Sequence, residues 1–181
     1  MKKIIILNGP PRCGKDVAAN AIQQYLGTDT VAHLKFSTPL KTIAMLILGG
    51  DPVLHEQLKD VPTNFKSLSY REMQIIIFNE LARSLGIDWL GQIMVRSILA
   101  EESDYIVISD GGRPEDVAPM LRLLPSKEVM ILQIMRNNCN FTHDIRMYLS
   151  DNRAIMRHIV NDDLDTFKNN VIDVASAFFG D

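Results

Sequence analysis

The apolar residues of the chain gather into three nearly unbroken runs that predict buried β-strands. These runs lie within residues 2–8, 105–110 and 129–135, and they are rich in Ile and Val. Continuous apolar, β-branched runs of this length are typical of strands covered on both faces. Two weaker runs, at residues 30–36 and 158–160, bring the expected sheet to about five strands.

Elsewhere the apolar residues recur every three to four positions, which predicts amphipathic helices. Ser69 and Glu72 form a capping-box pair at one helix start, and Met73, Ile77, Leu81 and Leu85 follow as an apolar stripe. Ser37 is expected to cap another helix, and Pro119 to kink or restart the helix that contains it. The expected helices cover residues 15–26, 38–47, 69–85, 89–99, 111–124 and 164–178.

Two polar segments lack a regular pattern. Residues 53–68 predict a loop with one short helix, and residues 137–157 predict an irregular segment with a short helix near 144–149. Outside these segments, strands alternate with helices along the chain. That alternation predicts an α/β fold in which a parallel sheet carries helices on both faces.

The segment between the first strand and the first helix carries a phosphate-binding motif. Residues 9–16, GPPRCGKD, have the spacing G-x-x-x-x-G-K in a strand–loop–helix context. The two glycines let backbone N–H groups turn toward phosphate oxygens, and Lys15 adds a mobile positive charge. Asp16 stands where such loops usually have a Ser or Thr hydroxyl for magnesium. The sequence therefore predicts a nucleotide-binding loop.

Composition excludes several classes of protein. The 181 residues suit a single domain, and a formal net charge of −3 gives no general attraction to nucleic acid. Cys13 and Cys139 lack metal-ligand spacing and indicate no disulfide framework. No apolar stretch is long enough to span a membrane, and the first apolar run ends too early for a signal peptide. We therefore expect a cytoplasmic protein without a membrane or nucleic-acid partner.

Further motifs resemble those of the phage deoxynucleoside monophosphate kinases, within the P-loop kinase superfamily. The similar segments are Gly14-Lys15-Asp16, Phe36-Ser37-Thr38-Pro39-Leu40-Lys41, Arg71-Glu72-Met73-Gln74 with Glu80 and Arg83, Asp88-Trp89, Ser109-Asp110 with Arg113-Pro114-Glu115, Arg136, Thr142-His143 and Asn161-Asp162. The resemblance implies one P-loop kinase domain over residues 1–181. It also implies a helical acceptor-binding region at about 37–100, a small lid at about 137–157, and host cytoplasm as the location if the protein is phage-encoded. Val17, Phe78-Asn79 and the Gly111-Gly112 turn depart from the family pattern.

The resemblance also implies which residues handle the phosphoryl donor, ATP. Asp110 ends a strand expected beside the loop strand, so Asp16 and Asp110 are the expected ligands of Mg²⁺. Arg136, Arg146 and Arg153 surround the expected lid, where an arginine either stabilises charge on the transferring group or is only solvated. The residues expected to act in transfer are Lys15, Asp16, Asp110, Arg113 and Arg136. Those expected to contact ATP are Gly9, Arg12, Cys13, Gly14, Lys15, Asp16, Val17 and Asn161.

The acceptor is expected on the helix that begins at Ser69. Arg71 and Gln74 are three residues apart and so share one helix face. A guanidinium suits an acceptor phosphate, and an amide suits the edge of a base. Arg83 lies about half a turn away from Gln74 around an ideal helix, so a surface role is equally open for it. With the residues added by the resemblance, the expected acceptor set is Lys41, Arg71, Gln74, Arg83 and Trp89.

These expectations describe an enzyme that uses ATP and Mg²⁺ to phosphorylate nucleoside or deoxynucleoside monophosphates to diphosphates. The acceptor phosphate is already a nucleophile at neutral pH, so alignment, charge neutralisation and a closing lid would suffice. Two alternatives stay open: a P-loop protein that binds nucleotide without turnover, and a P-loop kinase for another small phosphorylated acceptor, such as a coenzyme precursor or phosphomevalonate. The apolar run 75–78 leaves room for a homodimer face.

Overall fold

The computed structural model describes residues 2–125, 128–142 and 144–180. His143, part of one motif noted above, lies outside the described residues. The chain divides into two compact units. We call Met1–Phe36 with Gly91–Asp181 the sheet unit, and Ser37–Leu90 the helical unit.

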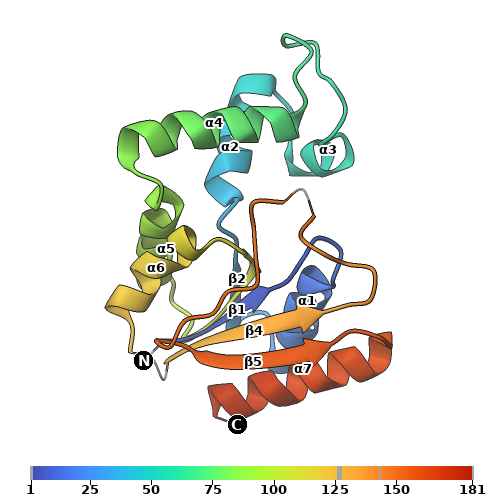
Figure 1. The fold of residues 1–181 in the computed structure, drawn as a ribbon, viewed down its shortest axis with the longest axis vertical. Coiled ribbons are helices and arrows are strands. Elements are labelled where there is room, and N and C mark those ends of the chain that lie inside the picture. Colours follow the sequence, from blue (N-terminus) through green and yellow to red (C-terminus); the bar gives the residue numbers. More distant parts are fainter. Residues whose placement is uncertain (1, 126–127, 143, 181) are drawn as a thin grey trace. The chain divides into compact units, whose positions relative to one another are not determined.

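The described residues of the sheet unit form a five-stranded parallel sheet (Figure 1). The strand order is β2-β3-β1-β4-β5, so the strand that leads into the glycine loop is central. The predicted α/β fold is confirmed, and the last strand begins three residues earlier than predicted. The strands are β1 (Lys3–Asn8), β2 (Val31–Leu34), β3 (Tyr105–Gly111), β4 (Val129–Met135) and β5 (Ile155–Val160).

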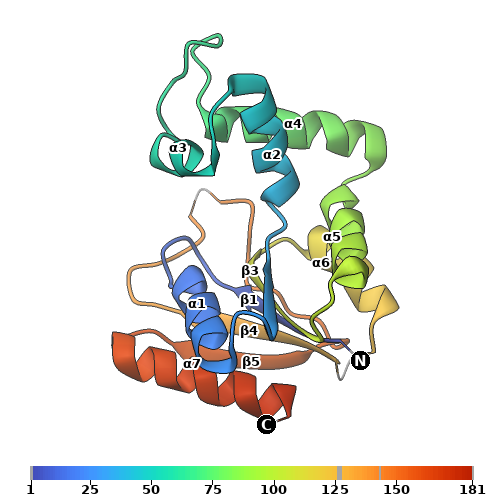
Figure 2. The same ribbon diagram turned by 180° about the vertical axis from the view of Figure 1, so that it is seen from behind.

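Helices cover both faces of this sheet (Figures 1 and 2). On one face, α1 (Lys15–Leu26) packs beside α7 (Leu164–Phe179), and Ile22, Phe167 and Val171 are fully buried in the core there. On the other face lie α5 (Trp89–Ala100) and α6 (Pro114–Leu123). Gly91 permits their close approach, because a Cβ there would lie 2.3 Å from the Asp116 carbonyl oxygen.

Two sequence expectations in the sheet unit differ from the structure. Of the kink or restart expected at Pro119, the restart does not occur, because α6 continues through Pro119. Proline removes only the hydrogen bond to the Glu115 carbonyl, and that residue is exposed to solvent at the first turn. The short helix expected near 144–149 is absent, and the described residues 144–149 are irregular. Their backbone groups are held by side chains of the sheet instead, as described below.

The helical unit contains α2 (Thr38–Leu48), α3 (Pro52–Gln57) and α4 (Tyr70–Leu85). The predicted capping box of α4 is confirmed: the Glu72 N–H donates to Ser69 Oγ at 3.2 Å, and the Ser69 N–H donates to Glu72 Oε2 at 2.8 Å. The apolar stripe of α4 is buried only in its first half, since Leu85 is 64% exposed. Ser37 is the N-cap of α2 but does not cap with its side chain, because its backbone is helical rather than extended.

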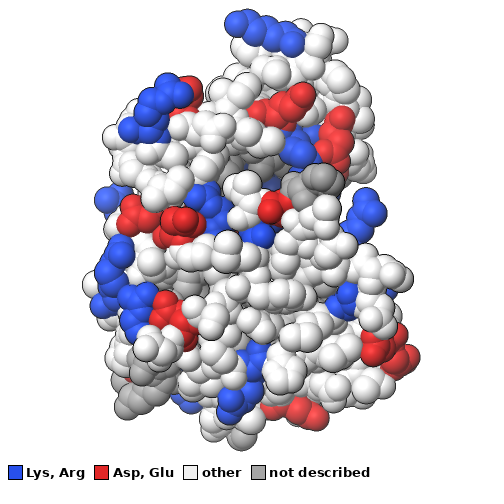
Figure 3. Space-filling model, in the orientation of Figure 1, with Lys and Arg blue, Asp and Glu red and all other residues white. Residues whose placement is uncertain are grey.

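Surface charge and helix hydrophobicity agree with the composition. On the face in Figure 3, basic and acidic side chains are interspersed among uncharged residues rather than gathered into one basic patch. Among the described residues, none of the helices combines the length and the apolar character needed to cross a membrane.

Candidate phosphate-binding site

The loop between β1 and α1 requires glycine at both ends of its motif. A Cβ on Gly9 would lie 2.5 Å from the Ile134 carbonyl oxygen of β4. Gly14 has φ +111°, and a Cβ there would lie 2.5 Å from Asn161 Nδ2. Glycine adopts that backbone conformation at little cost, whereas other residues are strained by it. The two glycines therefore let the loop turn back closely over the carboxyl ends of β4 and β5.

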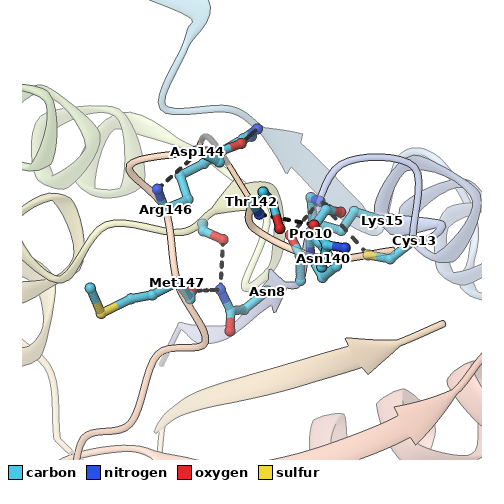
Figure 4. Close-up of polar contacts among 11 residues, drawn as sticks. Asn8, Pro10, Cys13, Lys15, Asn140, Thr142, Asp144, Arg146 and Met147 are labelled. Carbon is cyan, nitrogen blue, oxygen red and sulfur yellow. Dashed lines mark hydrogen bonds and ion pairs between the residues drawn. The ribbon is translucent and has the colours of Figure 1, made fainter. Parts of the chain in front are cut away.

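Lys15 lies inside this loop and bonds to its backbone (Figure 4). Its Nζ donates to the carbonyl oxygens of Gly9 and Pro10, both at 2.7 Å. Burial lowers the pKa of Lys15; nearby Cys13 opposes this effect, and the positive charge of Arg146 adds to it. An ammonium that is partly desolvated and close to a second cation is a good partner for an anion.

Two side chains from the ends of neighbouring strands fix the shape of the loop. Asn161, just after β5, donates from Nδ2 to the Cys13 carbonyl oxygen at 2.8 Å. Arg136, just after β4, donates from Nη1 to the Arg12 carbonyl oxygen at 3.1 Å. Both predicted residues thus lie at the loop. Cys13 itself is fully buried, and burial raises the pKa of its thiol, so it packs as a small neutral residue.

The two predicted carboxylates lie at the start of α1 and the end of β3. Asp16 Oδ1 accepts from Lys35 Nζ at 2.7 Å and from Ser109 Oγ at 3.2 Å. Burial acts to raise the pKa of Asp16, but the hydrogen bond and positive charge of Lys35, together with the Ser109 hydrogen bond, hold the pKa below its ordinary value. Asp110 Oδ1 accepts from the Phe36 N–H at 2.8 Å. Asp16 is therefore hydrogen bonded to Ser109, the residue immediately before Asp110.

Sequence reasoning missed the polar residues that surround Asp16. His33 Nε2 lies 2.7 Å from Ser109 Oγ, so His33, Ser109 and Asp16 form a hydrogen-bonded chain. His33 and Lys35 are two residues apart at the end of β2, and this period places their side chains on one face of an extended chain. That spacing was a usable signal, but the pairing of β2 with β3 was needed to interpret it.

Arg146, in the segment expected to form the lid, lies near enough to Lys15 for its positive charge to act on that lysine. It is doubly hydrogen bonded to Asp144, which raises the pKa of Arg146 and keeps the guanidinium charged. Its stem rests on Gly112, where a Cβ would lie 2.8 Å from three of its side-chain carbons. Arg153, by contrast, pairs with Asp151 and is 44% exposed.

Arg113 lies at the start of α6. Its side chain is largely buried, and its Nε is 3.9 Å from Glu115 Oε2 and 3.8 Å from Asp116 Oδ2. Val17 lies two residues after Lys15 in α1 and is partly exposed. Among the described residues, no group of three or more His, Cys, Asp or Glu side chains is arranged to hold a metal ion.

Three of the predicted acceptor residues gather around α3 in the helical unit. Arg71 forms an ion pair with Asp60, and Lys41 Nζ lies 3.3 Å from Glu56 Oε2. Gln74 Nε2 lies 2.9 Å from Nε2 of His55, a buried residue whose ring packs 4.9 Å from that of Tyr70. Two of these contacts are made to residues of α3, and the third is made to Asp60, which follows that helix.

The other two predicted acceptor residues lie elsewhere. Arg83 pairs with Glu80 at 3.0 Å on the exposed end of α4. Trp89 is buried against Phe78, with ring centroids 6.3 Å apart, and its indole N–H has no hydrogen-bond partner in the described part of the chain. None of the five lines a pocket of about 570 Å³ in the helical unit, whose lining residues include Leu48, Leu54, Leu58, Phe65 and Tyr70.

Comparison with known proteins supports a kinase-like fold. No known protein-family profile matches the chain. The chain is 27% identical over 118 residues to a phosphomevalonate kinase of Drosophila melanogaster. The match covers 65% of this chain and 59% of that enzyme, so the chain spans little more than half the length of the relative.

Solved structures share the fold at very low sequence identity. TT1252 from Thermus thermophilus matches with a TM-score of 0.52 and 10% identity, and the match covers 97% of each chain. A putative kinase from Chloroflexus aurantiacus J-10-fl matches with a TM-score of 0.48 and 12% identity over 97% of each chain, a likeness too distant to support a conclusion. The loop motif, the parallel sheet and the phosphomevalonate kinase match together support the P-loop kinase superfamily.

Proposed function

We propose that this protein is an ATP-dependent kinase that transfers a phosphoryl group to the phosphate of a small acceptor. One observation carries the proposal: the glycine loop encloses Lys15, and a second cation, Arg146, is close enough to lower the pKa of that lysine. Lys15 is partly buried near this second cation, which is itself paired with Asp144, so an anion bound in the loop would stabilise the charge of the lysine. The chain of phosphates of ATP is the anion that this loop motif binds.

The proposed chemistry needs no general base. An oxygen of the acceptor phosphate forms a bond to the γ-phosphorus of ATP, and the bond from that phosphorus to the β–γ bridging oxygen breaks, leaving ADP. Lys15 and Arg146 would offset the negative charge on the transferring group and on the departing oxygen. Arg136 would keep the loop in shape through its bond to the Arg12 carbonyl.

The residues around Asp16 fit a magnesium ion by ligand type. Asp16 and Asp110 offer carboxylate oxygens, and Ser109 offers a hydroxyl oxygen hydrogen bonded to Asp16. Oxygen atoms of these kinds are the ligands that Mg²⁺ prefers, and it usually takes only one or two carboxylates together with substrate phosphates. When bound, the ion would neutralise charge on the β- and γ-phosphates.

For the acceptor we propose a nucleoside or deoxynucleoside monophosphate. Arg71 and Gln74 lie one turn apart on α4, and each already holds a polar partner, Asp60 and His55, that an acceptor's phosphate and base could replace. A guanidinium forms paired hydrogen bonds with phosphate, and an amide pairs with the edge of a base. Phosphomevalonate is the second candidate, and the similarity to the Drosophila phosphomevalonate kinase favours it.

An acceptor screen tests the proposal directly. The protein is incubated with ATP, Mg²⁺ and one acceptor at a time, and the formation of ADP is measured for each common nucleoside and deoxynucleoside monophosphate and for phosphomevalonate. Lys15→Ala is the matched control, with a loss of roughly 10²-fold or more expected. ADP formation that depends on one acceptor and on Lys15 supports a kinase and names its acceptor. Tight ATP binding without ADP from any acceptor would instead favour a binding protein without turnover.

A further inference from the structure

The irregular segment that follows Arg146 is held to the sheet by two amide side chains. We propose that Asn8 and Gln133, which we call the amide clamp, are positioning residues that hold Arg146 at the phosphate site. This inference rests on the proposed function for the role of Arg146, although the clamp itself can be tested without catalysis. Neither amide was singled out from the sequence.

The clamp spans two neighbouring strands. Asn8 of β1 and Gln133 of β4 are partners in the parallel register, so both side chains leave the sheet side by side. The Leu149 N–H donates to Asn8 Oδ1 at 2.9 Å, and Gln133 Nε2 donates to the Leu149 carbonyl oxygen at 2.8 Å. Both backbone groups of one buried residue are therefore satisfied by side chains.

Asn8 also ties the same segment to the third strand. Its Nδ2 donates to the Gly111 carbonyl oxygen of β3 at 3.0 Å and to the Met147 carbonyl oxygen at 2.9 Å (Figure 4). The Met147 N–H in turn donates to the Gly112 carbonyl oxygen at 2.9 Å. Asn8 is fully buried and so uses both amide hydrogens and its oxygen on backbone groups.

These bonds restrict the residue immediately before Met147, which is Arg146. On its other side, Arg146 is fixed by its paired hydrogen bonds to Asp144, and its stem lies on Gly112. The segment has no helix or strand of its own, so its backbone depends on the clamp for hydrogen bonds. Loosening the clamp would free the backbone that sets where the Arg146 charge lies relative to Lys15.

A purely structural role for the amides would predict something different. A buried amide that only fills the core would, when altered, lower stability and weaken every function together. A positioning residue instead acts through Arg146, and its effect must disappear when Arg146 is removed. Residues that act as one unit show strong non-additivity in double-mutant cycles, and this difference separates the two explanations.

The kinetic test uses near-isosteric variants. Asn8→Asp keeps the oxygen that accepts from the Leu149 N–H, but it replaces the amide nitrogen that donates to Gly111 and Met147 with an oxygen. Gln133→Glu replaces the amide nitrogen that donates to the Leu149 carbonyl oxygen. Gln23→Glu is the matched control, because Gln23 Nε2 donates to the Val31 carbonyl oxygen at 2.9 Å, away from this segment. With the acceptor found in the screen, we expect kcat to fall roughly tenfold or more in both clamp variants, with little change in the KM for ATP.

The same substitutions are then made in an Arg146→Ala background. There we expect each clamp variant to change kcat by less than about threefold, because the group that the clamp positions has been removed. Equal kcat losses in both backgrounds would overturn the proposal, and so would a clamp variant that remains folded and has wild-type kcat. Circular dichroism and thermal melting report folding, and Gln133→Glu serves if Asn8→Asp does not fold.

A second measurement needs no activity. Trypsin cleaves after arginine, so the rate of cleavage at the bond between Arg146 and Met147 reports how firmly the segment is held. Cleavage after the more exposed Arg153 is the internal reference. We expect selective acceleration after Arg146 in the clamp variants and not in Gln23→Glu. Unchanged cleavage would refute the clamp, whereas a wild-type protein without kinase activity would refute only the proposed function.

Discussion

At the scale of single residues, the site depends on a few side chains that a motif identifies and on others that only the fold brings near. Lys15 and the two glycines follow from the motif, and their contacts agree with its logic. Asp16 is different, because its carboxylate stands where a hydroxyl is usual, while a hydroxyl from Ser109 on another strand lies 3.2 Å away. The chain thus has both oxygen types, supplied by separate elements.

This arrangement gives a prediction for Asp16. We expect Asp16→Asn to raise the Mg²⁺ concentration needed for half-maximal rate by roughly tenfold or more, since an amide is a poorer ligand than a carboxylate. Binding of metal-free ATP should change little. The measurement is a magnesium titration of the rate beside a binding titration without metal. Superimposable magnesium curves for the two proteins would mean that Asp16 serves only the helix start.

At the scale of elements, the hydrophobic pattern predicts what depends on local sequence and fails where distant groups decide. The strands and the capped helix α4 follow from apolar runs and the pair Ser69 and Glu72. The helix expected near 144–149 does not form, because Asn8 and Gln133 take the backbone groups that a helix would use. Which polar residues meet in the site could not be predicted, since this depends on the strand order.

The contact between α3 and α4 gives a prediction with a pH dependence. Burial lowers the pKa of His55; Lys41 adds to this and Glu56 opposes it, with smaller contributions that lower it from Lys59 and Arg71. The unfolded chain therefore binds a proton more readily than the folded one. The stabilisation by neutral His55 is fully present at pH values above 6.5, the ordinary pKa of histidine. It is lost as the pH falls from there through the lower pKa of His55 in the folded protein.

We therefore expect the helical unit to melt at a lower temperature at pH 5 than at pH 7.5. His55→Gln keeps a polar partner for Gln74 but cannot titrate, so it should show a smaller difference between the two pH values. Thermal melting followed by circular dichroism at both pH values makes the comparison. A difference of the same size in His55→Gln would assign the pH effect to other groups.

At the scale of the whole molecule, the chain has two units with separate proposed tasks. The nucleotide loop and the amide clamp belong to the sheet unit, whereas Lys41, Arg71 and Gln74 belong to the helical unit. A ligand stabilises only the folded state that binds it. The two units should therefore respond differently to ATP.

We expect calorimetry to resolve two unfolding transitions, and ATP with Mg²⁺ should raise the midpoint temperature of one of them. Met73→Ala, which removes a buried side chain of α4, should lower the midpoint temperature of the other, because it destabilises that unit by about 2–5 kcal/mol. Val171→Ala in the core of the sheet unit is the matched control, and it should lower the transition that responds to ATP. A single transition that shifts with ATP and with either substitution would show that the units unfold together.

The central place of β1 also has a consequence for folding. Ile4 lies beside Ile106 on one side and Val129 on the other, so both partners of β1 come from more than half the chain away. Closing such long loops costs chain entropy before any contact compensates for it, and sheets built this way form slowly. The strand that carries the glycine loop is made before β3 and β4 and must wait for both. The proposed nucleotide site is therefore expected to be among the last parts of the molecule to assemble, after the locally connected helices of residues 37–90.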